Sequence, residues 1–371
     1  AWTSDSKYSE TPGDFMESFV KTVKLAQDAG ASAINITYWH TATPEEMPQF
    51  AGVLYDLLIN HKLSAVTEAT VQNEPNSTNL SLDVYHECYL SLDQSLRTLG
   101  IRDRIEFVGG DLVQTNQESW FNYMGTKMNT LLAGYSTHVY WDDNDAAKPG
   151  NRLKEVINIV KGLGSSSKPV FVTEYGVRGG NKTGAPNPGF LTGTSTPVSQ
   201  TTTSALQNAL FQITGLNLGF SGFIRWDCYK AKYDNGTQYF SCIGSGTDGY
   251  PLYPLYYMTW LFTHTSRPGW KVVETRHQND PLKHVATMTD QEGTNLTLYA
   301  LNKSNGMLPF AFGGLPPGKS FRQVIWNKDL DGKLAKMSDL VADQQGVIRL
   351  NIPGQSIASL TTLELNISEL P

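Results

Sequence analysis

From residue 1 to about residue 268 the chain alternates between short apolar runs and amphipathic stretches, and this alternation limits the possible folds more than any other feature. The first amphipathic stretch carries Phe15, Phe19 and Val23 on one helical face, and Gly30 ends it. Short apolar runs that alternate with such helices are typical of parallel strands covered on the outside. The sequence therefore predicts an α/β fold built on a parallel sheet.

The alternation gives six strands with helices between them. Strands are expected at residues 33–39, 64–74, 105–110, 134–141, 169–175 and 221–227, and the later helices at 45–61, 81–99, 117–131, 151–163, 200–215 and 254–264. A (β/α)8 TIM barrel needs eight strands. If the strands that end at Glu74 and Glu174 are the fourth and the seventh, the first strands are missing, and a preceding N-terminal segment or chain completes the barrel. An open six-stranded sheet is the alternative, although it leaves two apolar edges unpaired.

From about residue 269 the pattern changes to an alternation of apolar and polar residues. Residues 295–301, 322–326 and 346–352 show this period of two, and Gly, Pro and Asn turns separate them. This pattern predicts an antiparallel β-sandwich. The 371 residues also exceed what one small core usually serves. We therefore expect two domains, a barrel at 1–268 that is N-terminally incomplete and a β-sandwich at 269–371.

Two of the predicted barrel strands end in a glutamate just before a turn. Glu74 closes the string Thr70-Val-Gln-Asn-Glu74, and Glu174 closes Val170-Phe-Val-Thr-Glu174. The active site of a barrel lies at the carboxyl ends of its strands, where successive loops converge. Cleavage of a glycosidic bond needs two carboxyl groups, one that gives a proton and one that attacks or activates water. Glu74 and Glu174 are therefore the predicted catalytic residues.

The strings Gln72-Asn-Glu-Pro-Asn76 and Thr173-Glu-Tyr-Gly176 resemble the acid/base and nucleophile signatures of clan A glycoside hydrolases. Family 30 is the most similar, with families 39, 51 and 5 as alternatives, and the resemblance covers strands three to eight and the sandwich. It implies that Glu74 is the acid/base and Glu174 the nucleophile of a retaining double displacement through a covalent glycosyl-enzyme intermediate. The Arg that many members carry at the end of strand two has no counterpart here.

Other residues at predicted strand ends are candidates for binding the sugar. Asn73 could hydrogen-bond the 2-hydroxyl group, and the resemblance implies an aromatic platform at the end of strand eight. The candidate substrate-binding residues are Asn73, Trp39, His138, Tyr140, Trp141 and Trp226, although packing in the core or rim is the alternative for several of them. Asp111 could line the site or fix a loop.

Composition excludes several classes of function. The net charge of −6 gives no basic surface for nucleic acid, and no apolar stretch reaches the roughly 18 residues of a membrane helix. The His and Cys residues show no zinc-type spacing, so neither a metal nor another cofactor is expected. The expected partner is a carbohydrate substrate. The alternatives are a carbohydrate-binding barrel with weak or no catalytic activity and a purely structural module.

The cysteines and the glycosylation motifs bear on localisation. Cys228 and Cys242 flank a short polar loop that a disulfide could close, whereas Cys88 is expected to be a buried free thiol. Asn-x-Ser/Thr motifs occur at Asn35, Asn76, Asn79, Asn181, Asn235, Asn295, Asn302 and Asn366. Together these features favour a secreted protein and allow a glycoprotein.

Overall fold

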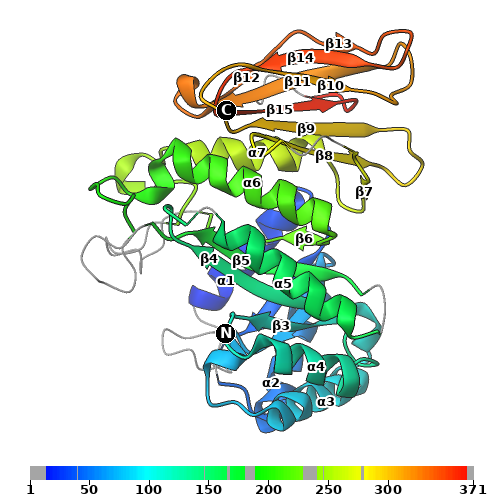
Figure 1. Ribbon diagram of the computed structural model, residues 1–371. Coiled ribbons are helices and arrows are strands. Elements are labelled where there is room, and N and C mark those ends of the chain that lie inside the picture. Colours follow the sequence, from blue (N-terminus) through cyan, green and yellow to red (C-terminus); the bar gives the residue numbers. More distant parts are fainter. Residues whose placement is uncertain are drawn as a thin grey trace. The chain divides into compact units, whose positions relative to one another are not determined.

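The computed structural model describes residues 14–39, 41–145, 147–164, 168–179, 189–228, 240–244, 246–276 and 280–365 (Figure 1). The chain forms two compact units. The first unit comprises residues 1–139 and 155–174, and the second comprises residues 140–154 and 175–371. Among the described residues, no helix is long and apolar enough to cross a membrane.

Residues 14–265 form the predicted parallel sheet and its helices. Its strands are β1 (Ile34–Tyr38), β2 (Val66–Val71), β3 (Glu106–Leu112), β4 (Gly134–Trp141), β5 (Val170–Val177) and β6 (Gly222–Phe223), and the helices are α1 (Asp14–Asp28), α2 (Met47–Tyr55), α3 (Leu82–Thr98), α4 (Gln117–Lys127), α5 (Lys148–Gly162), α6 (Thr202–Leu218) and α7 (Pro254–Thr265). The strands lie side by side in chain order, and the pairs from β1 to β4 are parallel. This is the order expected for strands three to eight of a (β/α)8 barrel.

Three predicted elements differ from the structure. The strand predicted at 64–74 ends at Val71, so Glu74 lies in the segment that follows β2. The helix predicted at 45–61 is divided into η1 (Pro44–Glu46), α2 and the π-helical η2 (Asp56–Asn60). The strand predicted at 221–227 is reduced to β6, because Ile224 is half exposed and the apolar run does not continue as a regular strand. The remaining short helices are η3 (Pro75–Ser77), η4 (Arg102–Arg104), η5 (Val198–Gln200), η6 (Gly246–Asp248) and η7 (Lys328–Leu330).

Strands β2 and β3 separate toward their carboxyl ends, and a buried tyrosine fills the space between them. The two strands pair only at Glu68 with Glu106 and at Ala69 with Phe107. Beyond that point the Val71 N–H donates to Tyr89 Oη (3.0 Å), which in turn donates to Val108 O (2.6 Å). The Tyr89 hydroxyl, which comes from α3, thus forms a hydrogen bond with one backbone group of β2 and one of β3 at the point where the two strands no longer pair.

The second unit contains the predicted antiparallel β-sandwich. Its strands are β7 (Lys271–Val273), β8 (Lys283–Thr289), β9 (Leu296–Asn302), β10 (Leu308–Phe312), β11 (Ser320–Asn327), β12 (Lys333–Lys336), β13 (Leu340–Val341), β14 (Ile348–Ile352) and β15 (Ser356–Thr361). The larger sheet has the order β12-β11-β15-β9-β8-β7, with β13 also paired to β11, and the smaller sheet is the pair β10-β14.

The strands β9, β11 and β15 of the larger sheet are buried on both faces, and their successive residues reach two different cores. Tyr299, Leu301 and Trp326 pack with apolar residues of α6 and α7, whereas Leu298 and Ile325 pack with residues of β10 and β14. Successive side chains of a strand point to opposite faces, so one run supplies both cores. The predicted domain boundary at residue 268 therefore falls inside the second unit, since α6 and α7 share a core with the sandwich strands.

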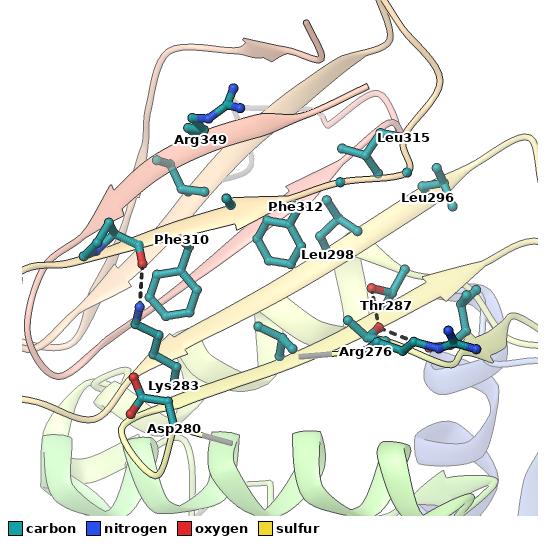
Figure 2. A pocket seen from close by; sticks show the side chains of 18 of the residues that line it. Arg276, Asp280, Lys283, Thr287, Leu296, Leu298, Phe310, Phe312, Leu315 and Arg349 are labelled. Atoms are coloured by element: carbon teal, nitrogen blue, oxygen red, sulfur yellow. Dashed lines mark hydrogen bonds between the residues drawn. The ribbon is translucent and has the colours of Figure 1, made fainter. Parts of the chain in front are cut away.

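A groove of about 1110 Å³ lies in the sandwich and is lined by β8, β9, β10 and β14 (Figure 2). Phe310, Phe312 and Leu298 form its apolar lining. The Nζ atom of Lys283 donates to Pro309 O (2.8 Å), and Pro309 has no N–H to offer. At Pro309, β10 therefore has no backbone N–H to donate, and its carbonyl oxygen already accepts from Lys283. A further strand could not form regular backbone hydrogen bonds with β10 at this residue.

Replacement of Tyr89 by Phe tests the bridge between β2 and β3. Tyr89→Phe leaves the Val71 N–H and the Val108 carbonyl without their buried partner, so the free energy of unfolding is expected to fall by about 1–3 kcal/mol. Urea denaturation followed by fluorescence measures it. Tyr123→Phe is the matched control, because the Tyr123 hydroxyl donates to Asp83 at the surface and its loss should cost less than about 0.5 kcal/mol. Equal losses in the two variants would contradict a special role for Tyr89.

Candidate active site

The segment that follows β2 holds Glu74 in an unusual backbone conformation. Gln72 and Glu74 have φ angles of 68° and 47°, which lie in the left-handed region that residues other than glycine rarely occupy. The Ala42 N–H donates to Gln72 Oε1 (2.7 Å) and fixes the start of the segment. Such a conformation persists only where surrounding contacts impose it.

Asn76 supplies the contacts at the other end of the segment. Its Nδ2 atom donates to Val113 O (2.8 Å) and to Thr115 O, and its Oδ1 atom accepts from the Val113 N–H (3.1 Å). The side chain is 9% exposed. The amide therefore joins the loop after β2 to the loop after β3, so that Glu74 is held from both sides.

Glu174 lies within β5 and faces Glu74 across the carboxyl ends of the strands. One carboxylate oxygen of Glu74, one of Glu174 and a ring nitrogen of His138 all lie within 4.8 Å of one another. The side chains of Glu74 and Glu174 are 30% and 21% exposed, so both carboxyl groups are partly accessible to solvent. The structure therefore brings the two predicted catalytic glutamates together.

His138 of β4 lies between the two glutamates and a third acidic residue. Its Nδ1 atom is 3.0 Å from Glu74 Oε1 and 3.5 Å from Glu174 Oε2, and its Nε2 atom is 3.7 Å from Asp111 Oδ1. Burial alone would lower the pKa of His138, but hydrogen bonds with Asp111 and Glu74 and the charges of Asp111 and Glu174 raise that pKa to about 10. The imidazolium thus places a positive charge among three carboxyl groups. This positive charge favours the close approach of the two glutamates.

Asp111 is held below the glutamates by hydroxyl groups. Ser136 Oγ donates to Asp111 Oδ1 (2.8 Å) and accepts from the Asp111 N–H (2.6 Å), and Thr173 Oγ1 donates to the same carboxylate oxygen. Burial alone would raise the pKa of Asp111, but His138 and the two hydroxyl groups hold that pKa below its usual value. The sequence left open that Asp111 lines the site or fixes a loop, but the structure shows a third arrangement. Asp111 lies within β3 and is only 2% exposed, so it is a fixed carboxylate beneath the site.

Gly110 allows β3 and β4 to approach closely beside this cluster. Its φ angle is 134°, and a Cβ atom at this position would lie 2.2 Å from Ser136 O. Any larger residue would push β4 away, and with it Ser136 and His138. Nothing in the sequence pattern indicated that Ser136 and Thr173 hold a buried carboxylate. The signal that could have revealed Ser136 is the polar run Ser136-Thr137-His138 inside a strand expected to be buried.

The other predicted sugar-binding residues lie in varied environments. Trp39 directly follows β1 and is 63% exposed, as an aromatic platform requires. Asn73 and Trp226 are half-buried. Tyr140 is half-buried too, and its ring meets Phe240 edge to face with centroids 5.5 Å apart. Their contacts with a sugar stay predictions.

Two of the predicted sugar contacts are corrected by the structure. Trp141 is fully buried, its Nε1 atom donates to Gln207 Oε1 (2.7 Å), and its ring stacks on Phe211. Successive residues of a strand point to opposite faces, so Trp141 cannot share the face of Tyr140. His138 is also buried, and it contacts the glutamates where a sugar contact was expected. Trp141 is therefore a packing residue and His138 a partner of the carboxyl groups.

The disulfide that Cys228 and Cys242 could form is absent from the structure. Cys88, Cys228 and Cys242 are all free thiols, and Cys88 is buried as predicted. The Cys242 N–H donates to Cys228 O (2.9 Å), so the backbones of these two residues are adjacent.

Several solved structures share the fold of this chain. The catalytic domain of GH30 xylanase C from Talaromyces cellulolyticus matches with a TM-score of 0.70 at 12% identity, over 95% of this chain and 81% of that one. A conserved exported protein from Bacteroides fragilis matches with a TM-score of 0.70 at 14% identity, over 97% and 81%. The family 51 α-L-arabinofuranosidase AbfB from Bifidobacterium longum matches with a TM-score of 0.62 at 14% identity, over 92% and 78%.

The chain has the fold of a clan A glycoside hydrolase. The prediction of a TIM barrel with a C-terminal β-sandwich is thereby confirmed, and so is the resemblance to family 30. No model of a known protein family and no curated protein sequence matches the chain. At 12% and 14% identity the solved structures establish the fold alone.

Replacement of Asn76 tests how the segment that carries Glu74 is held. Asn76→Ala removes the amide that joins the two loops, so amide hydrogen exchange in residues 72–78 is expected to accelerate about 10- to 100-fold, because a lost buried hydrogen bond weakens local stability by about 1–3 kcal/mol. Mass spectrometry measures the exchange. Asn79→Ala is the matched control, since Asn79 is exposed in the same loop. Unchanged exchange in Asn76→Ala would show that other contacts hold Glu74.

Proposed function

We propose that the protein is a retaining glycoside hydrolase that cleaves β-linked bonds in an oligosaccharide or polysaccharide. The observation that carries this proposal is the close approach of Glu74 and Glu174, since one carboxylate oxygen of each lies within 4.8 Å of one of the other. Retaining enzymes hold their two carboxyl groups about 5–5.5 Å apart, whereas inverting enzymes leave about 6.5–9.5 Å for a water molecule. The spacing here supports direct attack by one carboxylate on the sugar.

The proposed reaction proceeds in two displacements. In the first, a Glu174 oxygen bonds to the anomeric carbon, the bond to the leaving oxygen breaks, and Glu74 gives its proton to that oxygen. In the second, a water oxygen bonds to the anomeric carbon, the ester bond to Glu174 breaks, and Glu74 takes the proton of the water. Two inversions at the same carbon retain its configuration.

The assignment of the roles rests on the environments of the two residues. Glu74 is the more exposed of the two, at 30% against 21%, and it belongs to a loop, from which a leaving group and then water can reach it. Glu174 belongs to a strand, so its carboxylate is held by regular backbone. Among the described residues, Trp39 is the exposed aromatic side chain next to a strand end that best suits a sugar face.

We also propose that the protein acts outside the cell. One similar solved structure is an exported protein. Asn79 is an exposed residue in a glycosylation motif, so a glycan could be attached there. In contrast, the amides of Asn76 and Asn302 are engaged in buried hydrogen bonds and cannot accept a glycan in the folded chain. The motifs at Asn181, Asn235 and Asn366 lie outside the described residues.

Chemical rescue of alanine variants tests the reaction and the roles. Glu174→Ala is expected to abolish the cleavage of aryl β-glycosides, starting with xylosides, and added azide should restore turnover with a product of opposite anomeric configuration. Glu74→Ala should be rescued with retained configuration, because azide then attacks the glycosyl-enzyme. NMR of the azide products distinguishes the two outcomes.

Glu118→Ala is the matched control, since Glu118 is exposed in the first turn of α4. If no aryl glycoside of any sugar is cleaved while sugars still bind, the protein is a carbohydrate-binding barrel. If Glu74→Ala and Glu174→Ala cleave as fast as the unchanged protein, the assignment of the site is wrong.

A further inference from the structure

Asp111 is a buried carboxylate that the two displacements do not use. It is 2% exposed, so a substrate cannot reach it. Its Oδ1 atom faces His138 Nε2 at 3.7 Å, on the side of the ring opposite to the glutamates. Two hydroxyl groups, of Ser136 and Thr173, donate to the same oxygen and favour its charged form. A fixed negative charge therefore lies directly behind the ring.

The other side of the ring presents one donor to two acceptors. When both ring nitrogens carry a proton, Nδ1 has a single N–H, and that N–H faces Glu74 Oε1 at 3.0 Å and Glu174 Oε2 at 3.5 Å. Because these distances differ by only 0.5 Å, a small rotation of the ring or of either carboxyl group exchanges the preferred acceptor. Hydrogen bonds to a charged acceptor are stronger than those to a neutral one.

In the proposed reaction the negative charge of the glutamate pair changes place twice. Before the first displacement Glu174 is the carboxylate and Glu74 carries the proton. In the glycosyl-enzyme Glu174 is a neutral ester, and Glu74 has become the carboxylate. Hydrolysis returns the charge to Glu174. At each stage one of the two acceptors in front of Nδ1 is charged and the other is neutral.

We propose that Asp111 is a positioning residue that keeps His138 doubly protonated, so that the Nδ1 proton can shift its hydrogen bond to whichever of Glu74 and Glu174 carries the charge. This inference rests on the proposed function for the glutamates. The imidazolium then stabilises both the attacking carboxylate of the first step and the basic carboxylate of the second. Without the charge of Asp111, burial would favour the neutral ring, whose Nδ1 atom could become an acceptor facing two carboxyl groups.

Few titratable groups face Asp111 and His138. Glu74, Asp111 and Glu174 face His138 from the segment after β2, from β3 and from β5. The tyrosines Tyr85 and Tyr89 of α3 lie near Asp111, and burial raises the pKa of both, so they remain uncharged at neutral pH. Among the described residues, Asp111 is therefore the acidic partner of His138 that takes no part in the chemistry.

Asp111→Asn removes the charge with little change of shape. Asp111 has a φ angle of 54°, and Asn tolerates this left-handed conformation as well as Asp does. The pKa of His138 is expected to fall by at least about one unit, which is a tenfold decrease in its proton affinity. Ser136→Ala is the matched control, because it removes a hydrogen bond to Asp111 and leaves the charge. It should shift the pKa of His138 by clearly less.

The primary measurement is ¹⁵N NMR of histidine-labelled full-length protein as a function of pH, with the His138 signal assigned from its loss in His138→Gln. In the unchanged protein both nitrogens of His138 should be protonated at pH 7. The second measurement is the pH dependence of kcat and KM. Asp111→Asn should keep KM within about twofold and lose kcat as pH rises through the new pKa of His138 measured by NMR.

A neutral His138 at pH 7 in the unchanged protein would overturn the proposal, and so would an Asp111→Asn variant in which the pKa of His138 is unchanged. The first of these results needs only the unchanged protein and a folded His138→Gln reference that assigns the signal. The NMR measurement also needs no substrate. Failure to find glycosidase activity would therefore refute the proposed function and leave the Asp111–His138 pairing separately measurable.

Discussion

The burial of a charged histidine ring among three carboxyl groups is the interaction on which the arrangement of this site depends. A buried charge is tolerated only where partners compensate for the lost water. Here neighbouring elements supply them in order, with Glu74 after β2, Asp111 on β3, His138 on β4 and Glu174 on β5. The side-by-side order of these strands is therefore an electrostatic requirement as well as a topological one.

The same requirement explains why the backbone departs from regular geometry near the strand ends. Gln72, Glu74 and Asp111 all adopt left-handed conformations, and β2 has separated from β3 before the site is reached. Tyr89 and Asn76 satisfy the backbone groups that this separation exposes. The regular sheet below the site and the irregular segments around it are thus linked, because side-chain hydrogen bonds replace the missing ladder.

Much of this architecture could be predicted from the sequence, since period and turn residues define helices and strands. The pair Glu74 and Glu174 could be predicted because strand ends of a barrel converge. The direction in which a single side chain points could not be predicted from the sequence. A strand buried on both faces shows no polar alternation, so nothing in the pattern indicated that Trp141 points toward Phe211. The role of His138 depended on Asp111, which is close in space and distant in sequence.

The core shared by α6, α7 and the large sheet sets a limit on how this protein can be recombined. Trp326 of β11 donates from Nε1 to the Pro254 carbonyl at the start of α7 (3.1 Å), and Tyr299 of β9 packs on Phe262. A cut at the apparent change of sequence pattern would separate these partners and expose large aromatic surfaces on both pieces. The last two helices of the barrel and the sandwich therefore form a single structural block, and exchanging the sandwich for that of another protein would require exchanging those helices with it.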